Sequence, residues 1–192
     1  PLFYSILEKY NLGKVACELL DCPEIILFQD NLIWKPSGTE RRVQWHQDFS
    51  YWPLSAGHGA TFWVALDDIR QETGALSYIP RSEQWGECRA MNFTNDGISE
   101  GQDHLVPLPW EQHEQEQVVM EIKAGQVLAH HPFLAHMSYP NISQNHRRAW
   151  SLTWITPDVA WDTEHAPHPY PLFHSVQNGA RVEGNDFPRF KR

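Results

Sequence analysis

From residue 25 onward the chain consists of short apolar or alternating runs that Pro, Gly and Asn separate at close intervals. This texture is typical of all-β sandwiches and barrels, because a strand needs only a few residues and the turn residues between strands reverse the chain. The candidate strands are Ile25–Trp34, Gln44–Asp48, Thr61–Asp67, Leu76–Ile79, Val118–Ile122, Val127–His131 and Arg148–Ile155.

The ends of the chain differ from this middle part. Residues 1–24 carry the apolar spacing of one or two short helices, which Gly13 interrupts. The β core is expected at about 25–156, and 157–192, rich in Pro and His, is expected to wrap irregularly over it. A chain of 192 residues is the size of one ordinary domain, so we predict a single domain over 1–192.

Composition narrows the classes of function. The formal net charge is −9 and the basic residues form no run longer than a pair, which argues against a nucleic-acid surface. Three cysteines make neither a disulfide framework nor a CxxC zinc site, which fits a reducing compartment. Apolar runs are too short to span a bilayer, and Pro1 opens no signal-peptide pattern. We therefore expect a cytoplasmic protein without a membrane or nucleic-acid partner.

The first chemical motif is a His-x-Asp pair, His46 and Asp48. On a strand, residues two apart point to the same face, so an imidazole and a carboxylate would aim at a common point. Such a pair is common by chance, and a hydrogen-bonded His-Asp pair is the simpler interpretation when the motif is taken alone. The interpretation as metal ligands needs a third donor elsewhere in the chain.

Histidines that follow the turn at Gly125 can supply that donor. The apolar run after this turn leads to His130, His131 and His136. Two histidines and one carboxylate, with coordination positions left open, suit a non-haem Fe(II) oxygenase. All three histidines are candidates, and the spacing of the residues that follow favours His136.

A possible carboxylate anchor follows these histidines. Arg147 begins a strand face on which every later residue, at positions 149, 151 and 153, is small, whereas Arg148 shares its face with a tryptophan stripe. A small-lined face carrying one guanidinium resembles a cavity wall that binds a carboxylate by a two-pronged contact. Ser138, two positions after His136, can share that carboxylate.

Taken together, these motifs resemble the phytanoyl-CoA dioxygenase family of Fe(II)- and 2-oxoglutarate-dependent oxygenases. The similarity runs in family order from about residue 25 to 155. The matching stretches are Gln44–Trp52, Phe62–Asp68, Glu72–Leu76, Ile79–Ser82, His130–Asn141 and Arg147–Ala149. The sequence departs from the family pattern at Gln126, where Asp is usual, and at Arg81, where Gly is usual.

The resemblance implies a fold and a ligand set. It implies a double-stranded β-helix, the jelly-roll or cupin-like fold, with a few flanking helices, and an N-terminal helical region, 1–24, that is partly truncated relative to the family. The iron ligands it implies are His46, Asp48 and His136. The residues it implies for 2-oxoglutarate are Arg147, Ser138 and Trp63. The residues implied or expected at the substrate are Gln29, Tyr51 and Trp52.

The resemblance also implies a reaction. We expect an Fe(II) enzyme that uses 2-oxoglutarate and O2 to hydroxylate an unactivated C–H bond of a small organic molecule, releasing succinate and CO2. Related halogenases carry Gly or Ala at the position of Asp48, so its carboxylate favours hydroxylation. Two alternatives stay open: a jelly-roll metalloenzyme that does not use 2-oxoglutarate, and a metal-free cupin-like binding module. The identity of the substrate and the oligomeric state are left open.

Overall fold

The protein is described from a computed structural model, which covers residues 2–92, 97–98, 104–166 and 176–192. Its strands form a five-stranded sheet in the order β11-β1-β10-β3-β8, a four-stranded sheet in the order β2-β9-β4-β7 and a small β5-β6 ribbon. The strands are β1 Glu24–Lys35, β2 Val43–His46, β3 Gly59–Ala65, β4 Leu76–Tyr78, β5 Met91–Asn92, β6 Gly97–Ile98, β7 Val118–Met120, β8 Val127–His130, β9 His136–Ser138, β10 Arg147–Ile155 and β11 Arg189–Lys191.

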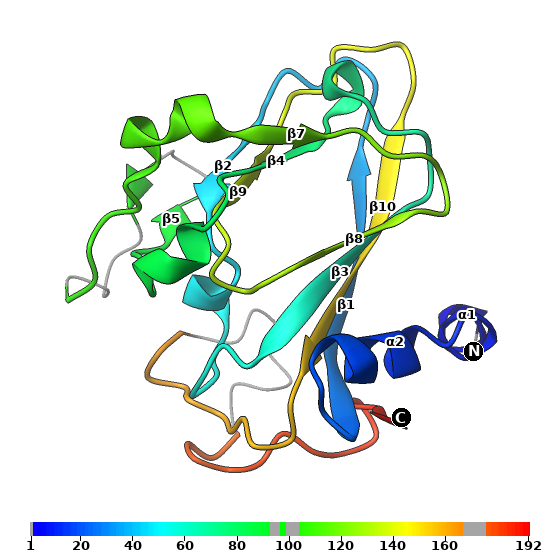
Figure 1. The fold of residues 1–192 in the computed structure, drawn as a ribbon, viewed down its shortest axis with the longest axis vertical. Coiled ribbons are helices and arrows are strands. Elements are labelled where there is room, and N and C mark those ends of the chain that lie inside the picture. The colour runs from blue at the N-terminus through cyan, green and yellow to red at the C-terminus, as the bar shows by residue number, and fades with distance from the viewer. Residues whose placement is uncertain (1, 93–96, 99–103, 167–175) are drawn as a thin grey trace.

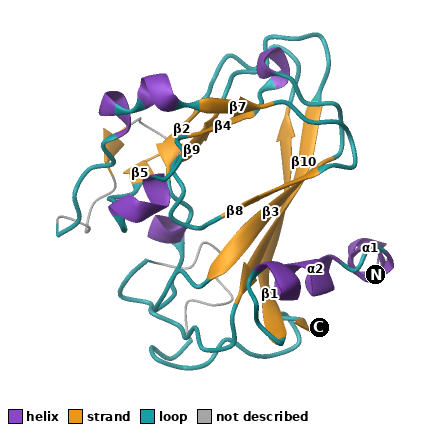
Figure 2. Cartoon of the chain, viewed as in Figure 1, coloured by secondary structure: helices purple, strands orange, loops and turns teal. Residues whose placement is uncertain are grey.

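The two larger sheets lie on opposite sides of the molecule, and β2, β9, β4 and β7 face β1, β10, β3 and β8 (Figure 1). The described strand pairs in both sheets are antiparallel. This is the two-sheet arrangement of a jelly roll. The prediction of an all-β core with a few flanking helices is confirmed (Figure 2).

Strand β10 contributes side chains to both faces of the large sheet. Its alternate residues Trp150, Leu152 and Trp154 pack against the helices in one hydrophobic cluster. Ala149 belongs to a second cluster, with Trp63 and Leu76, between the sheets. Because side chains alternate along a strand, this nine-residue strand packs against the helices on one face and against the other sheet on the opposite face.

Two helices, α1 Leu2–Lys9 and α2 Leu12–Leu19, cover part of the outer face. The expectation that Gly13 interrupts the helices is wrong. The break lies at Tyr10-Asn11, where Asn11 has a left-handed φ of 52°, and Gly13 is inside α2. Gly13 is needed for packing, since a Cβ there would collide with the ring of Phe190. Neither helix is long and apolar enough to cross a membrane, a statement limited to the described residues.

The C-terminal segment, predicted as an irregular wrap over 157–192, is more ordered than that where it is described. It ends in β11, which pairs with the start of β1. Val159, Trp161, Val182 and Phe187 are buried in a cluster with residues of β1. Residues 167–175 of the predicted wrap lie outside the described part of the chain.

The bounds of the 3-10 helices complete the secondary structure of the described chain. They are Phe49–Tyr51, Gln71–Thr73, Ser82–Trp85, Trp110–Gln112 and Glu114–Glu116.

Gly59 marks a close approach between β3 and β10. A methyl group at this position would collide with the backbone carbonyl of Trp154. We expect Gly59→Ala to lower the free energy of unfolding by about 1–3 kcal/mol, because backbone atoms in a paired strand have little freedom to move aside. Urea denaturation followed by circular dichroism measures this change.

Gly57→Ala is the matched control, because it adds the same methyl group two residues away. Its Cβ would lie 3.0 Å from the ring of Phe133, a side chain that can shift. We expect a smaller loss of stability. Equal losses in the two variants would contradict the assignment of the cost at Gly59 to the backbone contact.

Candidate metal centre and anion-binding cavity

The chain leaves the β conformation between the two residues of the His-x-Asp motif. Strand β2 ends at His46, and Asp48 has right-handed helical angles, φ −65° and ψ −43°, directly before the 3-10 helix Phe49–Tyr51. The predicted strand Gln44–Asp48 is therefore too long at its C-terminal end. The side chains of His46 and Asp48 therefore approach each other across a turn. The alternation of side chains along a strand does not explain their proximity.

Gln47 holds this turn from the other side. Its side chain is buried and donates hydrogen bonds to the carbonyls of Gly86 at 2.9 Å and Phe133 at 2.8 Å. It accepts one from the amide of Cys88 at 2.8 Å. One side chain thus joins the turn between His46 and Asp48 to two other segments, one of which leads into β9.

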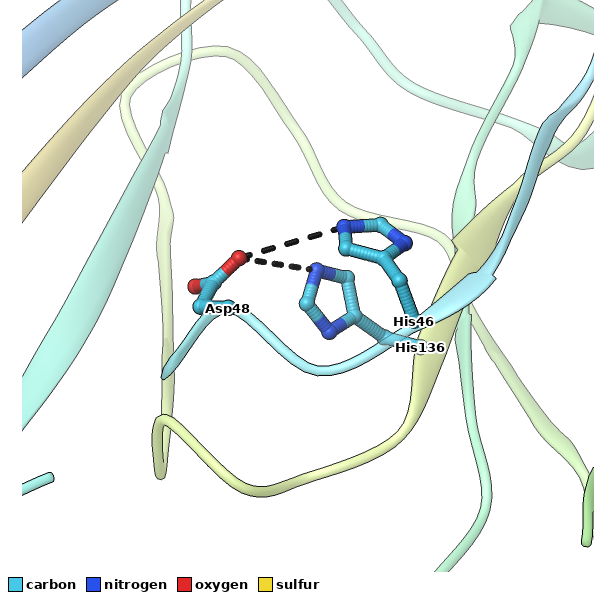
Figure 3. Close-up of side chains that lie close together, drawn as sticks. All are labelled: His46, Asp48 and His136. Carbon is cyan, nitrogen blue, oxygen red and sulfur yellow. Dashed lines mark ion pairs between the residues drawn. The ribbon is translucent and has the colours of Figure 1, made fainter. Parts of the chain in front are cut away.

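Strand β9 brings His136 to the same place. In the antiparallel pairing of β2 and β9, His136 lies opposite His46, and their ring centroids are 4.1 Å apart. Oδ1 of Asp48 lies 3.9 Å from Nε2 of His46 and 3.6 Å from Nε2 of His136 (Figure 3). These separations are too long for hydrogen bonds. The three donor atoms lie within 4.8 Å of one another, a spacing that can hold a metal ion.

The hydrogen bonds of the two imidazoles favour metal binding. Nδ1 of His46 donates to the carbonyl of Gln44 at 2.7 Å, and Nδ1 of His136 donates to that of Leu134 at 2.9 Å. A carbonyl only accepts, so Nδ1 carries the proton and Nε2 of a neutral ring offers its lone pair. Burial lowers the pKa of both histidines, which keeps the rings neutral.

The second oxygen of Asp48 is held by the protein. Oδ2 accepts hydrogen bonds from Oγ1 of Thr61 at 2.6 Å and from Nε2 of His130 at 3.1 Å. Burial alone would raise the pKa of Asp48, but the charge that His136 carries when it is protonated and the hydrogen bond from His130 hold this pKa well below its ordinary value. The carboxylate is therefore ionised and oriented with Oδ1 toward the other two donors.

The competing candidate His131 is exposed and lies outside this cluster of donors.

A buried guanidinium lies at the other end of the cavity that these donors line. Arg147 is 2% exposed, and its Nε and Nη1 have no hydrogen-bond partner among the described residues. Its guanidinium lies over the ring of Trp63, 5.2 Å from the centroid. Arg148 points outward and forms an ion pair with Asp67 at 2.6 Å. Buried nitrogens of a cation are costly when they lack hydrogen-bond partners, which indicates that this end suits an anion.

Lys35 lies beside Arg147 and is absent from the sequence prediction. The two residues are cross-strand partners on β1 and β10. Nζ of Lys35 donates to Oγ of Ser138 at 2.8 Å and to the carbonyl of Tyr139 at 2.5 Å. Burial, with a contribution from Arg147, lowers the pKa of Lys35 to about 7. The sequence signal for Lys35 was a lysine at the end of a predicted strand. The pairing that places it opposite Arg147 is set only by the strand register of the folded sheet.

A cavity of about 270 Å³ joins the two ends. Its lining residues are Ile33, Trp34, Lys35, Val43, His46, Asp48, Thr61, Trp63, Leu76, His130, His136, Ser138, Arg147 and Ser151. A neighbouring hollow of about 340 Å³ shares Trp34, Lys35 and Val43 with it and adds Arg41 and Arg42. The predicted iron and 2-oxoglutarate residues thus line one cavity.

The three residues expected at the substrate lie outside this lining. Trp52 is buried in the hydrophobic cluster that contains Phe28, and Gln29 is half-buried in β1 opposite Thr153. Tyr51 is nearer, with its ring 6.1 Å from that of His46, but its hydroxyl donates to the carbonyl of Met91 at 2.7 Å. The structure therefore brings the predicted metal and anion residues together, and it does not bring these three to the same surface.

A jelly roll that gathers two imidazoles and one carboxylate beside a buried guanidinium has the fold and the donor set of the non-haem iron oxygenases. The model of the phytanoyl-CoA dioxygenase (PhyH) family matches residues 10–149, and the chain belongs to this family. The resemblance found in the sequence motifs is confirmed.

Individual relatives agree with this assignment. The chain is 31% identical over 179 residues to a phytanoyl-CoA dioxygenase of Arabidopsis thaliana, covering 90% of this chain and 61% of the relative. It is 26% identical to an L-proline trans-4-hydroxylase of Streptomyces griseoviridis, covering 74% of this chain and 59% of the relative. The chain thus spans about three-fifths of the length of these curated relatives.

Solved structures show the same fold. The carbocyclase SnoK from nogalamycin biosynthesis, described as α-ketoglutarate dependent, superposes with a TM-score of 0.75 over 93% of this chain and 66% of SnoK, at 22% identity. The non-haem monooxygenase ThoJ superposes with a TM-score of 0.62 over 79% of this chain and 54% of ThoJ, at 27% identity. The predicted jelly roll is confirmed.

We expect Gln47→Leu to lower the free energy of unfolding by about 2–4 kcal/mol, because it leaves one buried and two partly buried backbone groups without their partner. Chemical denaturation of the purified variant measures the loss. Gln84→Leu, at an exposed position, is the control and should leave the stability nearly unchanged. Indistinguishable curves for the two variants would contradict the role assigned to Gln47.

Proposed function

We propose that this chain belongs to an Fe(II)- and 2-oxoglutarate-dependent dioxygenase that hydroxylates an unactivated C–H bond of a small organic molecule and releases succinate and CO2. The observation that carries the proposal is one cavity with two chemically different ends. Three metal-type donors converge at one end, and at the other lies a buried guanidinium whose Nε and Nη1 have no hydrogen-bond partner among the described residues.

His46, Asp48 and His136 are the residues proposed to hold Fe(II). Their donor set fits the ion, since both rings offer Nε2 and the carboxylate is ionised and oriented. Bound iron would supply the oxidative chemistry with O2 and the keto acid. The role of the protein is to hold the three ligands and to leave the remaining coordination positions free.

Arg147, Ser138 and Trp63 are proposed to hold 2-oxoglutarate, together with Lys35. 2-Oxoglutarate carries a carboxylate at each end, so one end can meet the metal while the other meets the two cations. The guanidinium has Nε and Nη1 without partners among the described residues and can donate from them to a carboxylate, and the hydroxyl of Ser138 lies beside Lys35. An anion here also offsets the repulsion between neighbouring cations.

The substrate is proposed to enter past Trp34 and Val43, where the cavity adjoins the second hollow. Trp34 is 60% exposed and offers an indole surface at this mouth. The hollow, which Arg41 and Arg42 also line, offers space for a molecule that extends beyond the cavity. Hydroxylation is preferred to halogenation because Asp48 supplies a carboxylate to the ligand set. The cytoplasmic location stays a prediction, as do the substrate roles of Gln29, Tyr51 and Trp52.

Metal binding and turnover test this proposal together. We expect the purified protein to bind one equivalent of Fe(II) under anaerobic conditions and to release succinate from 2-oxoglutarate when O2 is admitted. Asp48→Ala should lose both properties, because it removes one ligand and leaves two imidazoles. Isothermal titration and a succinate assay measure the outcomes.

Asp158→Ala is the control, because it removes an exposed carboxylate that pairs with a different histidine, His58. It should bind Fe(II) as the unaltered protein does. Metal binding without succinate release would favour the metalloenzyme that does not use 2-oxoglutarate. No metal binding at all would favour the metal-free binding module.

Lys35 makes the affinity for 2-oxoglutarate depend on pH. Below about pH 7 its amine is protonated and attracts a carboxylate, and above that pH the free protein loses this charge. Because the bound anion favours the protonated form, the affinity should fall as pH rises from 7 to 9, by up to roughly tenfold per unit. Anaerobic titration of the Mn(II)-loaded protein with 2-oxoglutarate measures the slope.

Two variants separate this effect from others. Lys35→Arg keeps the positive charge and should bind with little dependence on pH in this range. Lys35→Met should bind weakly at every pH. A slope in either variant equal to that of the unaltered protein would show that another group is responsible.

A further inference from the structure

A buried line of hydrogen bonds leads from the second sheet to the carboxylate of Asp48. The hydroxyl of Tyr78, on β4, lies 3.0 Å from Nδ1 of His130, on β8. Nε2 of the same ring lies 3.1 Å from Oδ2 of Asp48. Tyr78 and His130 are both buried, and they come from strands of different sheets. Neither residue was predicted to act in this way.

The chemistry of the partners sets the direction of these bonds. An ionised carboxylate only accepts, so Nε2 of His130 must carry a proton. In a neutral imidazole Nδ1 is then the acceptor, and the hydroxyl of Tyr78 is the donor. The line therefore runs as Tyr78 O–H to Nδ1, and Nε2–H to Oδ2.

This arrangement explains why His130 is not a fourth metal ligand. Its ring lies close to that of His136, with centroids 4.6 Å apart. Both of its nitrogens have partners, however, and neither offers a lone pair to the metal centre. With Thr61, His130 occupies Oδ2 and leaves Oδ1 as the oxygen that faces His46 and His136.

We propose that Tyr78 and His130 are positioning residues that make Asp48 a one-oxygen metal ligand. Tyr78 acts by holding the ring of His130 and by favouring the same tautomer as the Asp48 carboxylate does, and His130 acts by holding Oδ2 away from the metal. The inference rests on the proposed metal site. A carboxylate that cannot rotate presents one oxygen to the ion and leaves more of the coordination sphere open for other ligands.

Tyr78→Phe removes the hydroxyl and keeps the ring that packs between the sheets. Without this donor, Nδ1 of His130 loses its hydrogen-bond partner, and only the carboxylate of Asp48 still favours the tautomer with Nε2–H. We expect the affinity for Co²⁺, used alone as an oxygen-stable probe, to fall by about three- to tenfold. Tyr139→Phe is the matched control, because its hydroxyl bonds instead to Gln117 at 3.0 Å.

Substitution of His130 gives a second test that separates positioning from packing. Glutamine has one amide donor and one carbonyl acceptor, so His130→Gln can reproduce both hydrogen bonds. His130→Leu fills similar space and reproduces neither. We expect His130→Gln to retain most of the Co²⁺ affinity and His130→Leu to lose about 10- to 100-fold. Equal losses in the two variants would overturn the proposal.

The tautomer can be read directly in the metal-free protein. Two-bond ¹H–¹⁵N correlation spectra should show His130 with its proton on Nε2, and the population of this tautomer should fall in Tyr78→Phe but not in Tyr139→Phe. An unchanged tautomer, or an unchanged Co²⁺ affinity in Tyr78→Phe, would overturn the role of Tyr78. If the unaltered protein binds no Co²⁺, the proposed function fails, whereas the spectra still decide whether the hydrogen-bonded line exists.

Discussion

The arrangement of the cavity depends on one buried carboxylate. Asp48 is the single acidic residue among the described residues that line the cavity. An ionised carboxylate is expensive to bury unless strong donors surround it. Here the donors come from β3 and β8 of the large sheet, while His46 and His136 come from β2 and β9 of the other. The charge of one residue is thus satisfied only when both sheets are assembled.

The cationic end of the cavity shows the opposite balance. Lys35 and Arg147 are adjacent in the sheet, and like charges placed opposite each other destabilise a strand pair. The fold lowers the pKa of Lys35 and satisfies its amine with Ser138 and Tyr139, yet two nitrogens of Arg147 have no partner in the part of the chain that the structure describes. Stability alone does not explain such an arrangement, whereas an anionic ligand that completes the charge balance does.

Between these ends, short segments with no regular structure decide the geometry. The turn after β2 places Asp48, and the buried amide of Gln47 fixes that turn through three backbone contacts. Local propensity says little about such a turn, because its conformation follows from groups that arrive from residues 86–88 and 133. For this reason the predicted strand Gln44–Asp48 was too long. The alternating pattern continues to Asp48, but tertiary contacts end the strand at His46.

The sequence by itself determined the class of fold, the approximate positions of the main strands along the chain and the strand face on which Arg147 lies. These features follow from local periodicity, since alternation along β10 separates Trp150, Leu152 and Trp154 from the small residues of the other face. The sequence motifs also pointed to His46, Asp48 and His136, but their spacing could not show that they meet. Only the tertiary structure decided that Lys35 joins Arg147, that His130 supports Asp48 and that Trp52 is buried away from the cavity. The physical reason is that strand register and the pairing of distant sheets bring together residues whose separation along the chain carries no information about their contact.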